Sequence, residues 1–281
     1  MIIATTPKQA NDYVRQWKEE GLSIGLVPTM GYLHEGHRSL MERARKENDR
    51  VVASVFVNPT QFGPNEDFES YPRDFQADCA LCEGVGVDLV FHPEPSDMYF
   101  PDASTSITAD GVSKELCGKS RPIHFSGVCT VVNKLINIAM AERAYFGQKD
   151  AQQLAVIRRM VRDLNMNVEI VGCPIIREED GLAKSSRNTY LSAEDRKAAL
   201  CLSQAVFAGQ KLMQEGEKQA SVVLGTMRHI INAQPLARID YVEMVTWDSI
   251  QVTDTADGPV LVAMAVYIGK TRLIDNFIFG E

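Results

Sequence analysis

Two histidines flank a glycine where the chain is predicted to pass from a strand into a helix. His34 and His37 lie on either side of Gly36, after the apolar run 24–27 and before the helix-like stretch 38–44. A helix beginning here would offer unpaired N–H groups and its positive dipole end to the turn. Gly36 lets a ligand approach bare backbone, and imidazoles can donate hydrogen bonds to phosphate oxygens. The pattern predicts a nucleotide-binding turn, although so short a motif also occurs in ordinary loops.

Three further segments carry polar residues suited to such a ligand. Gln61 follows a predicted strand and offers amide donors and an acceptor, which suit a ligand with both a hydroxyl and a carboxylate. Lys149 is a compact cation for phosphate, and Asp150 begins a helix. The segment 180–188 adds two adjacent hydroxyls and an arginine, in a loop of the kind that closes over substrates. Taken alone, the Gln61 segment is better explained as an ordinary turn, and 180–188 is equally well explained as a solvated linker. For Lys149 and Asp150 the alternative, a solvated charge and a helix N-cap, is weakened because theirs is a third strand-to-helix turn on the same sheet edge.

The elements that position these residues alternate between strand and helix. Apolar runs predict strands at 23–28, 51–57, 87–91, 144–146 and 168–171. Amphipathic patterns predict helices from Pro7, with Ala10, Tyr13, Val14 and Trp17 on one apolar face, and at 37–47, 73–83, 126–140 and 150–164. Apolar strands alternating with amphipathic helices indicate a parallel sheet covered on both faces, which binds ligands beyond the carboxyl ends of its strands.

The pattern changes after about residue 176. Helices are predicted at 193–215 and 220–231, followed by strands at 240–245, 260–267 and 271–278. Helices followed by antiparallel strands indicate a smaller α+β domain. We therefore expect an α/β protein, with a Rossmann-like parallel-sheet domain over residues 1–175 and a smaller α+β domain over 176–281 that closes over the nucleotide.

Composition narrows the class of protein. The net charge of −8 over 281 residues argues against nucleic acid as a partner, and no stretch is long enough in apolar residues to cross a bilayer. The start of the chain does not resemble a secretion signal, and the six cysteines fit free thiols, so we expect a cytoplasmic protein. Cys79 and Cys82 form a C-x-x-C, for which a helical pair facing the core is a better account than a zinc or redox site.

Together, the polar segments resemble the pantoate–β-alanine ligase family, also called the pantothenate synthetases. The similar segments are 27–31, 34–37, 56–62, 71–73, 121–125, 146–150, 185–188 and 273–276, so the resemblance runs along almost the whole chain. The His-x-Gly-His turn alone also resembles the signature of the nucleotidyltransferase superfamily, which is shared with class I aminoacyl-tRNA synthetases.

The resemblance implies a two-step condensation of pantoate with β-alanine. The pantoate carboxylate attacks the α-phosphorus of ATP, which gives pantoyl adenylate and pyrophosphate. The β-alanine amine then attacks the activated carbonyl, and AMP and pantothenate are released. ATP is thus the expected co-substrate, with Mg²⁺ bridging its phosphates, and the expected partners are these small molecules and a second copy of the chain in a homodimer. The sequence contains no dedicated carboxylate cage, so ligands for the metal stay unassigned.

Carried over residue by residue, the resemblance implies catalytic roles for His37, His34 and Lys149, with His37 at the family's proton-donor position. It implies pantoate binding by Gln61 and Gln153, and β-alanine binding by Gln61. The implied ATP site comprises Met30, Gly31, Tyr32, Leu33, His34, Glu35, Gly36, His37, Gly147, Gln148, Lys149, Asp150, Ile176, Lys184, Ser185, Ser186 and Arg187. Lys184 replaces an apolar residue and Gln148 a glutamate common in the family, so the role of the Lys184 side chain is open.

Two other classes of protein remain as alternatives. A nucleotidyltransferase would use the same turn but would stop after nucleotidyl transfer and need no amine site. A non-enzymatic nucleotide sensor would keep the glycines but could dispense with His37, Lys149 and Gln61, all of which are present. A tRNA synthetase fits poorly, because the chain has no anticodon-binding extension and no basic face.

Overall fold

The structure, a computed structural model, describes residues 1–64 and 66–280, and these residues form two compact units. Unit 1 is built from the described residues of Met1–Ala109, Ile123–Gln148 and Val156–Pro174. Unit 2 is built from Asp110–Pro122, Lys149–Ala155 and the described residues from Ile175 onward. In the part of the chain that is described, no helix is both long and apolar enough to cross a membrane.

Unit 1 contains a six-stranded sheet whose neighbouring strands are all parallel. The strands are β1 (Ile2–Ala4), β2 (Ile24–Thr29), β3 (Arg50–Val55), β4 (Leu89–Phe91), β5 (Arg143–Gly147) and β6 (Glu169–Cys173), in the order β1-β4-β3-β2-β5-β6. The predicted α/β class with a parallel sheet is confirmed. Strand β1 was not predicted, because three residues at a sheet edge are too few to show a periodic pattern.

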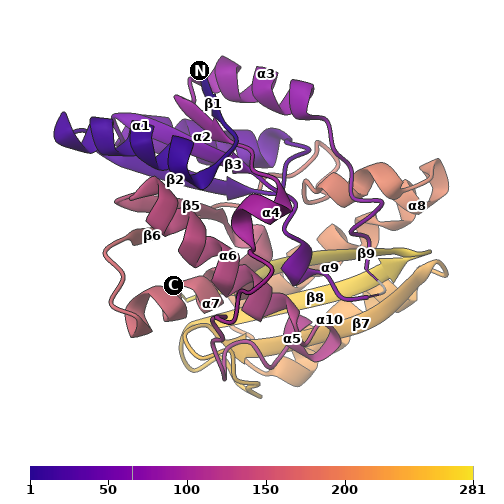
Figure 1. Ribbon diagram of the computed structural model, residues 1–281. Helices are drawn as coiled ribbons and strands as arrows, with labels where there is room; N and C mark the ends of the chain where they lie inside the picture. Colours follow the sequence, from indigo (N-terminus) through magenta and orange to yellow (C-terminus); the bar gives the residue numbers. More distant parts are fainter. Residues whose placement is uncertain (65, 281) are drawn as a thin grey trace. The chain divides into compact units, whose positions relative to one another are not determined.

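Helices cover both faces of this sheet (Figure 1). They are α1 (Pro7–Glu19), α2 (Glu35–Glu47), α3 (Phe75–Val85), α6 (His124–Ala139) and α7 (Ala151–Asp163), with the short α4 (Pro95–Met98) and the 3₁₀ turns η1 (Pro59–Gln61) and η2 (Gln148–Asp150) between them. Because parallel crossovers are right-handed, the strand order places α2 and α3 on one face and α1 and α6 on the other. The α2–α3 face buries a cluster that includes Val27, Met41 and Tyr145.

The first helix begins as the sequence predicts. Thr6 caps α1 in a capping box, and Pro7 occupies the first turn, where its missing N–H costs nothing. Val14 and Trp17 are buried, but Tyr13 is 40% exposed, so the predicted apolar face was wrong at that position. Tyr13 lies at the margin of the narrow stripe that faces the core, where an aromatic ring can remain in water.

Glu142, the residue before β5, joins two parts of unit 1. Its carboxylate accepts a hydrogen bond from the Ile24 N–H at 2.8 Å and pairs with the Lys18 ammonium. Burial raises the pKa of the Glu142 carboxyl, but the hydrogen bonds from Lys18 and Ile24 outweigh it, so the pKa lies below its ordinary value. The ionised form of Glu142 therefore stabilises the folded unit.

The C-x-x-C pair lies on α3, and the structural interpretation is confirmed for one of its two residues. Cys82 is buried, and burial raises the pKa of its thiol to about 12, which makes it unreactive. Cys79 is only half-buried, so the prediction that both face the core was wrong for Cys79. Within 1–64 and 66–280, no group of three or more His, Cys, Asp and Glu side chains is arranged to hold a metal ion.

Unit 2 contains a three-stranded antiparallel sheet, which is the predicted α+β arrangement (Figure 1, orange and yellow). Its elements are α5 (Cys117–Ser120), η3 (Ser186–Tyr190), α8 (Ala193–Ala198), α9 (Leu200–Gln214), α10 (Ala220–Asn232), β7 (Ala237–Thr246), β8 (Val260–Ile268) and β9 (Thr271–Phe279). Helix α9 packs on β9 and α10 on β7, around a core that includes Val206, Met227 and Met264. The single helix predicted over 193–215 is two helices, because the Leu202 N–H bonds the Ala199 carbonyl and tightens the turn between them.

The division into units is more interleaved than one cut after residue 175. The segments 110–122 and 149–155 belong to unit 2, although they precede the predicted boundary. The second of them takes the end of η2 and the start of α7 into unit 2, while the rest of α7 belongs to unit 1. The physical reason is their hydrogen bonding: the Gln152 side chain bonds the backbone of 110–122, and Asn276 of β9 bonds the Lys149 carbonyl. These long-range contacts leave no compositional mark at a boundary.

Candidate active site

The histidine turn leaves the sheet of unit 1 at the place where the strand order reverses. Strand β2 lies between β3 and β5, and the chain moves toward opposite edges of the sheet after β2 and after β5. In open α/β sheets, such a switch point forms the ligand crevice at the carboxyl ends of the strands. His34 and His37 follow β2, and Gly147 ends β5 with Gln148 next to it, so both segments leave the sheet at the switch point.

A buried carboxylate holds the turn in shape. Asp78 of α3 is 2% exposed, and its two oxygens accept hydrogen bonds from the Tyr32 N–H at 2.9 Å and the Leu33 N–H at 2.7 Å. Gly31 and Tyr32 have φ values of 81° and 51°, which turn successive N–H groups toward one concave anion-binding nest. Burial raises the pKa of the Asp78 carboxyl, and the bonds from Leu33 and Tyr32 oppose that rise. The nest is thus filled by the protein's own anion.

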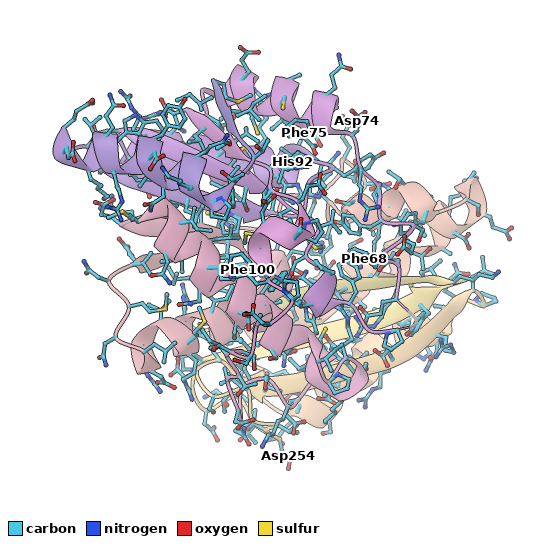
Figure 2. The ribbon with its side chains drawn as sticks, viewed as in Figure 1. Phe68, Asp74, Phe75, His92, Phe100 and Asp254 are labelled. Atoms are coloured by element: carbon cyan, nitrogen blue, oxygen red, sulfur yellow. The ribbon has the colours of Figure 1, made fainter. Side chains whose placement is uncertain are left out.

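Contacts at the start of α3 fix the position of this helix and therefore of Asp78. Asp74 caps the helix by accepting from the Ala77 N–H at 3.0 Å. Phe75 stacks on His92, with ring centroids 4.0 Å apart at 15°, and Figure 2 shows these labelled residues together near the start of α3. His92 Nδ1 lies 2.6 Å from the Val55 carbonyl, so that nitrogen carries the proton. No role was predicted for His92, and its contacts here are structural.

The two imidazoles cap helix α2. His34 is the N-cap residue, and its Nδ1 accepts from the Gly36 N–H at 3.1 Å, while His37 Nδ1 accepts from the His34 N–H at 3.3 Å. The ring centroids are 4.1 Å apart. A nitrogen that accepts a hydrogen bond carries no proton, so each neutral ring has its proton on Nε2. The rings therefore take the His34 and Gly36 N–H groups, which are among those expected to be open to a ligand.

Gln61 lies at the end of η1, beside Met30. Its amide nitrogen lies 2.9 Å from Met30 Sδ, and its amide oxygen accepts from Asn58 Nδ2 at 3.2 Å. The Gln61 carbonyl lies 3.0 Å from His124 Nδ1. The structure therefore brings together Gln61 and Met30, two predicted site residues, and adds Asn58 and His124 as the residues that hold Gln61.

Asn58 is itself buried in a network that sequence reasoning missed. It accepts from the Tyr99 hydroxyl at 2.7 Å and donates to the Gly127 carbonyl at 3.2 Å. Helix α6 comes so close to η1 that a Cβ on Gly127 would lie 2.4 Å from the Thr60 carbonyl oxygen. The available signal was an asparagine placed between an apolar strand and Pro59, where a buried amide needs partners.

The other predicted site residues belong to unit 2. Lys149 Nζ lies 3.5 Å from the Asp150 carboxylate, and the Lys149 carbonyl accepts from Asn276. Gln153 follows on the first turn of α7. The Ile176 carbonyl accepts from the Lys184 N–H at 2.9 Å, so these two predicted residues are adjacent.

The remaining predicted residues form a capped turn. Lys184 pairs with Glu178 at 2.9 Å, which gives its side chain a structural contact. Ser185 caps η3, since its hydroxyl oxygen accepts from the Arg187 N–H at 3.3 Å, and Ser186 is buried. The segment that was expected to be a loop therefore forms a 3₁₀ turn, in which Arg187 lies two residues after the capping residue Ser185.

A parallel sheet with two imidazoles fixed at its switch point defines an α/β enzyme of the His-x-Gly-His class. The family model described as Pantoate-beta-alanine ligase matches residues 2–278, and the chain belongs to that family. It is 59% identical to the pantothenate synthetase of Ruminiclostridium cellulolyticum over 279 residues, 99% of each chain. It is also 59% identical to that of Clostridium acetobutylicum over 280 residues, 100% of each chain. The chain is accordingly a ligase of pantothenate biosynthesis.

Solved structures agree with this assignment. A pantothenate synthetase from Thermus thermophilus has 44% identity and a TM-score of 0.94, with 99% of each chain covered. A pantoate-beta-alanine ligase from Francisella tularensis, complexed with beta-gamma ATP and beta-alanine, has 36% identity and a TM-score of 0.82, with 99% of this chain and 97% of that chain covered.

Proposed function

We propose that the chain joins pantoate to β-alanine through a pantoyl adenylate. The family match over residues 2–278 is the observation that carries this proposal. A carboxylate resists attack by an amine until its oxygen becomes part of a good leaving group, and AMP supplies that group. The first step leaves its negative charge on the departing pyrophosphate, so catalysis depends mainly on fixed donors and cations.

His34 and His37 are proposed to hold the phosphates through their Nε2–H groups. Their Nδ1 atoms are engaged by the backbone of the same turn, so the donors are oriented before ATP arrives. Stabilisation of charge is their larger contribution, because phosphoryl oxygens need little proton transfer. Lys149 adds the main cation from the segment that follows β5.

The remaining roles follow the family pattern. Gln61 and Gln153 bind pantoate, Gln61 also binds β-alanine, and unit 2 closes over the nucleotide. The other ATP-binding residues are Met30 to Gly36, Gly147, Gln148, Asp150, Ile176 and Lys184 to Arg187. Mg²⁺ is expected to enter with the ATP phosphates and to neutralise part of their charge. Because no described cluster of carboxylates, imidazoles or thiolates is arranged for a metal, we assign it no protein ligand. The homodimer and the cytoplasmic location also stay predictions.

The test follows both steps separately. With ATP, pantoate and β-alanine, we expect pantothenate and AMP in equal amounts. With pantoate labelled by ¹⁸O in its carboxylate, one labelled oxygen should appear in AMP, because the bond that breaks in the second step joins the acyl carbon to that oxygen. Formation of ADP, or multiple-turnover AMP formation that ignores β-alanine, would exclude the ligase. Multiple-turnover release of pyrophosphate together with an adenylylated product, in the absence of β-alanine, would favour a nucleotidyltransferase. Binding of ATP without turnover would favour a sensor.

A further inference from the structure

Two buried side-chain amides hold the short segment 149–155 of unit 2. We propose that Asn276 and Gln152 are positioning residues, which fix this segment and thereby aim Lys149 at ATP and Gln153 at pantoate. The inference rests on the proposed function for the roles of Lys149 and Gln153. It extends that function to two residues with no expected contact with either substrate.

Asn276 reaches the segment from β9. It is 4% exposed, and its Nδ2 donates to the Lys149 carbonyl oxygen at 2.8 Å. Its own backbone N–H donates to Asp275 Oδ1 at 2.8 Å, and Asp275 forms a two-point ion pair with Arg177 at 2.7 and 2.9 Å. The amide therefore projects from a buried, charge-paired strand position, which gives it a fixed orientation.

The hydrogen bond to the Lys149 carbonyl acts on the backbone from which the flexible lysine side chain extends. It fixes the peptide plane after Lys149 and so the direction in which the four-carbon stem leaves the backbone. Lysine has many rotamers, and its ammonium magnifies any rotation at its root. Because a misplacement of about 1 Å can cost about 10²-fold in rate, a fixed root matters for a phosphate-binding cation.

Gln152 holds the same segment at the first turn of α7. Its Oε1 accepts from the Cys117 N–H at 3.0 Å, and its Nε2 donates to the carbonyls of Val112 at 3.1 Å and Glu115 at 2.7 Å. All three partners are backbone groups of 110–122. Successive helical residues point about 100° apart, so clamping Gln152 fixes the rotation of α7 about its axis and with it the direction of Gln153.

Substitution of Asn276 should weaken mainly nucleotide binding, and substitution of Gln152 should weaken mainly pantoate binding. General destabilisation of the protein would affect both substrates in each variant. Asn276→Ala should weaken binding of a non-hydrolysable ATP analogue about tenfold, or about 1.4 kcal/mol, and leave the KM for pantoate within about twofold of the native value. Gln152→Ala should raise the KM for pantoate about tenfold and leave analogue binding within about twofold. Thr226→Ala is the matched control, because it removes a side-chain bond to the Val222 carbonyl on α10 and should change neither constant.

A double-mutant cycle tests whether Asn276 acts through Lys149. In a Lys149→Ala background, Asn276→Ala should weaken analogue binding by less than about twofold, since the side chain it positions is gone. An equal loss in both backgrounds would overturn the inference. If Asn276→Ala does not fold, the nearly isosteric Asn276→Asp, which replaces the donor by an acceptor, takes its place.

The outcomes distinguish failure of the positioning inference from failure of the proposed ligase function. If the native chain makes no pantothenate, the proposed function fails whatever the variants do. If the native chain is active but both constants move together in each variant, or neither moves, the positioning inference alone fails. Thermal unfolding of each variant shows whether the measured protein is folded.

Discussion

Replacement of His37 by asparagine should preserve the stability of the fold, whereas replacement by glutamine should preserve more of the catalytic activity. Its Nδ1 accepts from the His34 N–H, whereas its Nε2 is the nitrogen proposed to bind phosphate. Asparagine places its amide oxygen near the position of Nδ1 and has nothing at Nε2. Glutamine reaches the position of Nε2 and has nothing at Nδ1. The pair His37→Asn and His37→Gln therefore separates the capping function from the phosphate-binding function.

The expected sizes follow from what each variant removes. Loss of the capping-box acceptor that His37 gives to the His34 N–H costs about 1 kcal/mol, as for other helix caps, which lowers the Tm of a unit of this size by about 2–4 °C. Loss of one preorganised donor to a developing oxyanion costs about 10²–10³-fold in kcat, or about 2.7–4 kcal/mol. His37→Asn should thus keep the native Tm and lose kcat, whereas His37→Gln should lower the Tm and keep more of the kcat. His37→Ala should show both losses.

Calorimetry and pyrophosphate release measure the two effects independently. His229→Asn, at an exposed position on α10, is the control and should change neither the Tm nor kcat. If His37→Asn is destabilised as much as His37→Ala, the capping geometry is not what stabilises the turn. If His37→Asn keeps native kcat, Nε2 takes no part in the reaction.

Three further predictions test other contacts. Glu142→Gln should lower the Tm at pH 7, and the difference should shrink as the pH falls below about 4.3, because the lowered pKa makes Glu142 stabilising only while it is ionised; a pH-independent difference in melting would contradict this. Gly127→Ala should destabilise the protein by about 1–3 kcal/mol in denaturant titrations, because the clash with Thr60 exceeds the helix-propensity gain of about 1 kcal/mol. Gly225→Ala on α10, whose Cβ would meet nothing within 4 Å, should stabilise it instead, and equal effects at the two glycines would refute the packing argument. Asp78→Asn should cost about 1–3 kcal/mol and raise the KM for ATP in steady-state assays, and an unchanged KM would show that the turn keeps its shape without the carboxylate.

Local sequence patterns were sufficient to predict the parallel sheet and the edge of it at which the site lies. Apolar runs that alternate with amphipathic helices define a parallel sheet, and its carboxyl edge follows from chain direction alone. The histidine turn after β2 and the glycine that ends β5 were therefore placed at that edge correctly. The chemistry was narrowed by the resemblance to a family, because no single segment distinguishes a nucleotide site from an ordinary turn.

The residues that hold the site were not predictable from local pattern. Asp78 is separated by 46 positions from Tyr32, and Asn276 by 127 from Lys149. A polar residue inside a helix or strand normally indicates a solvent-facing position. Gln152 and Asn276 are instead buried, because each meets a distant backbone group that sequence periodicity cannot reveal.

The hydrogen bond between Asn276 and Lys149 also has a consequence during synthesis of the chain. The two residues are 127 positions apart, so at ~5–20 residues per second the ribosome makes Lys149 about 6–25 s before Asn276. Once β6 has also been made, the nascent chain has the strands of the parallel sheet but still lacks the contact that fixes Lys149. Lys149 is therefore held by this contact only after Asn276 has been made, so chains that terminate before Asn276 but retain the histidine turn should be poor ligases.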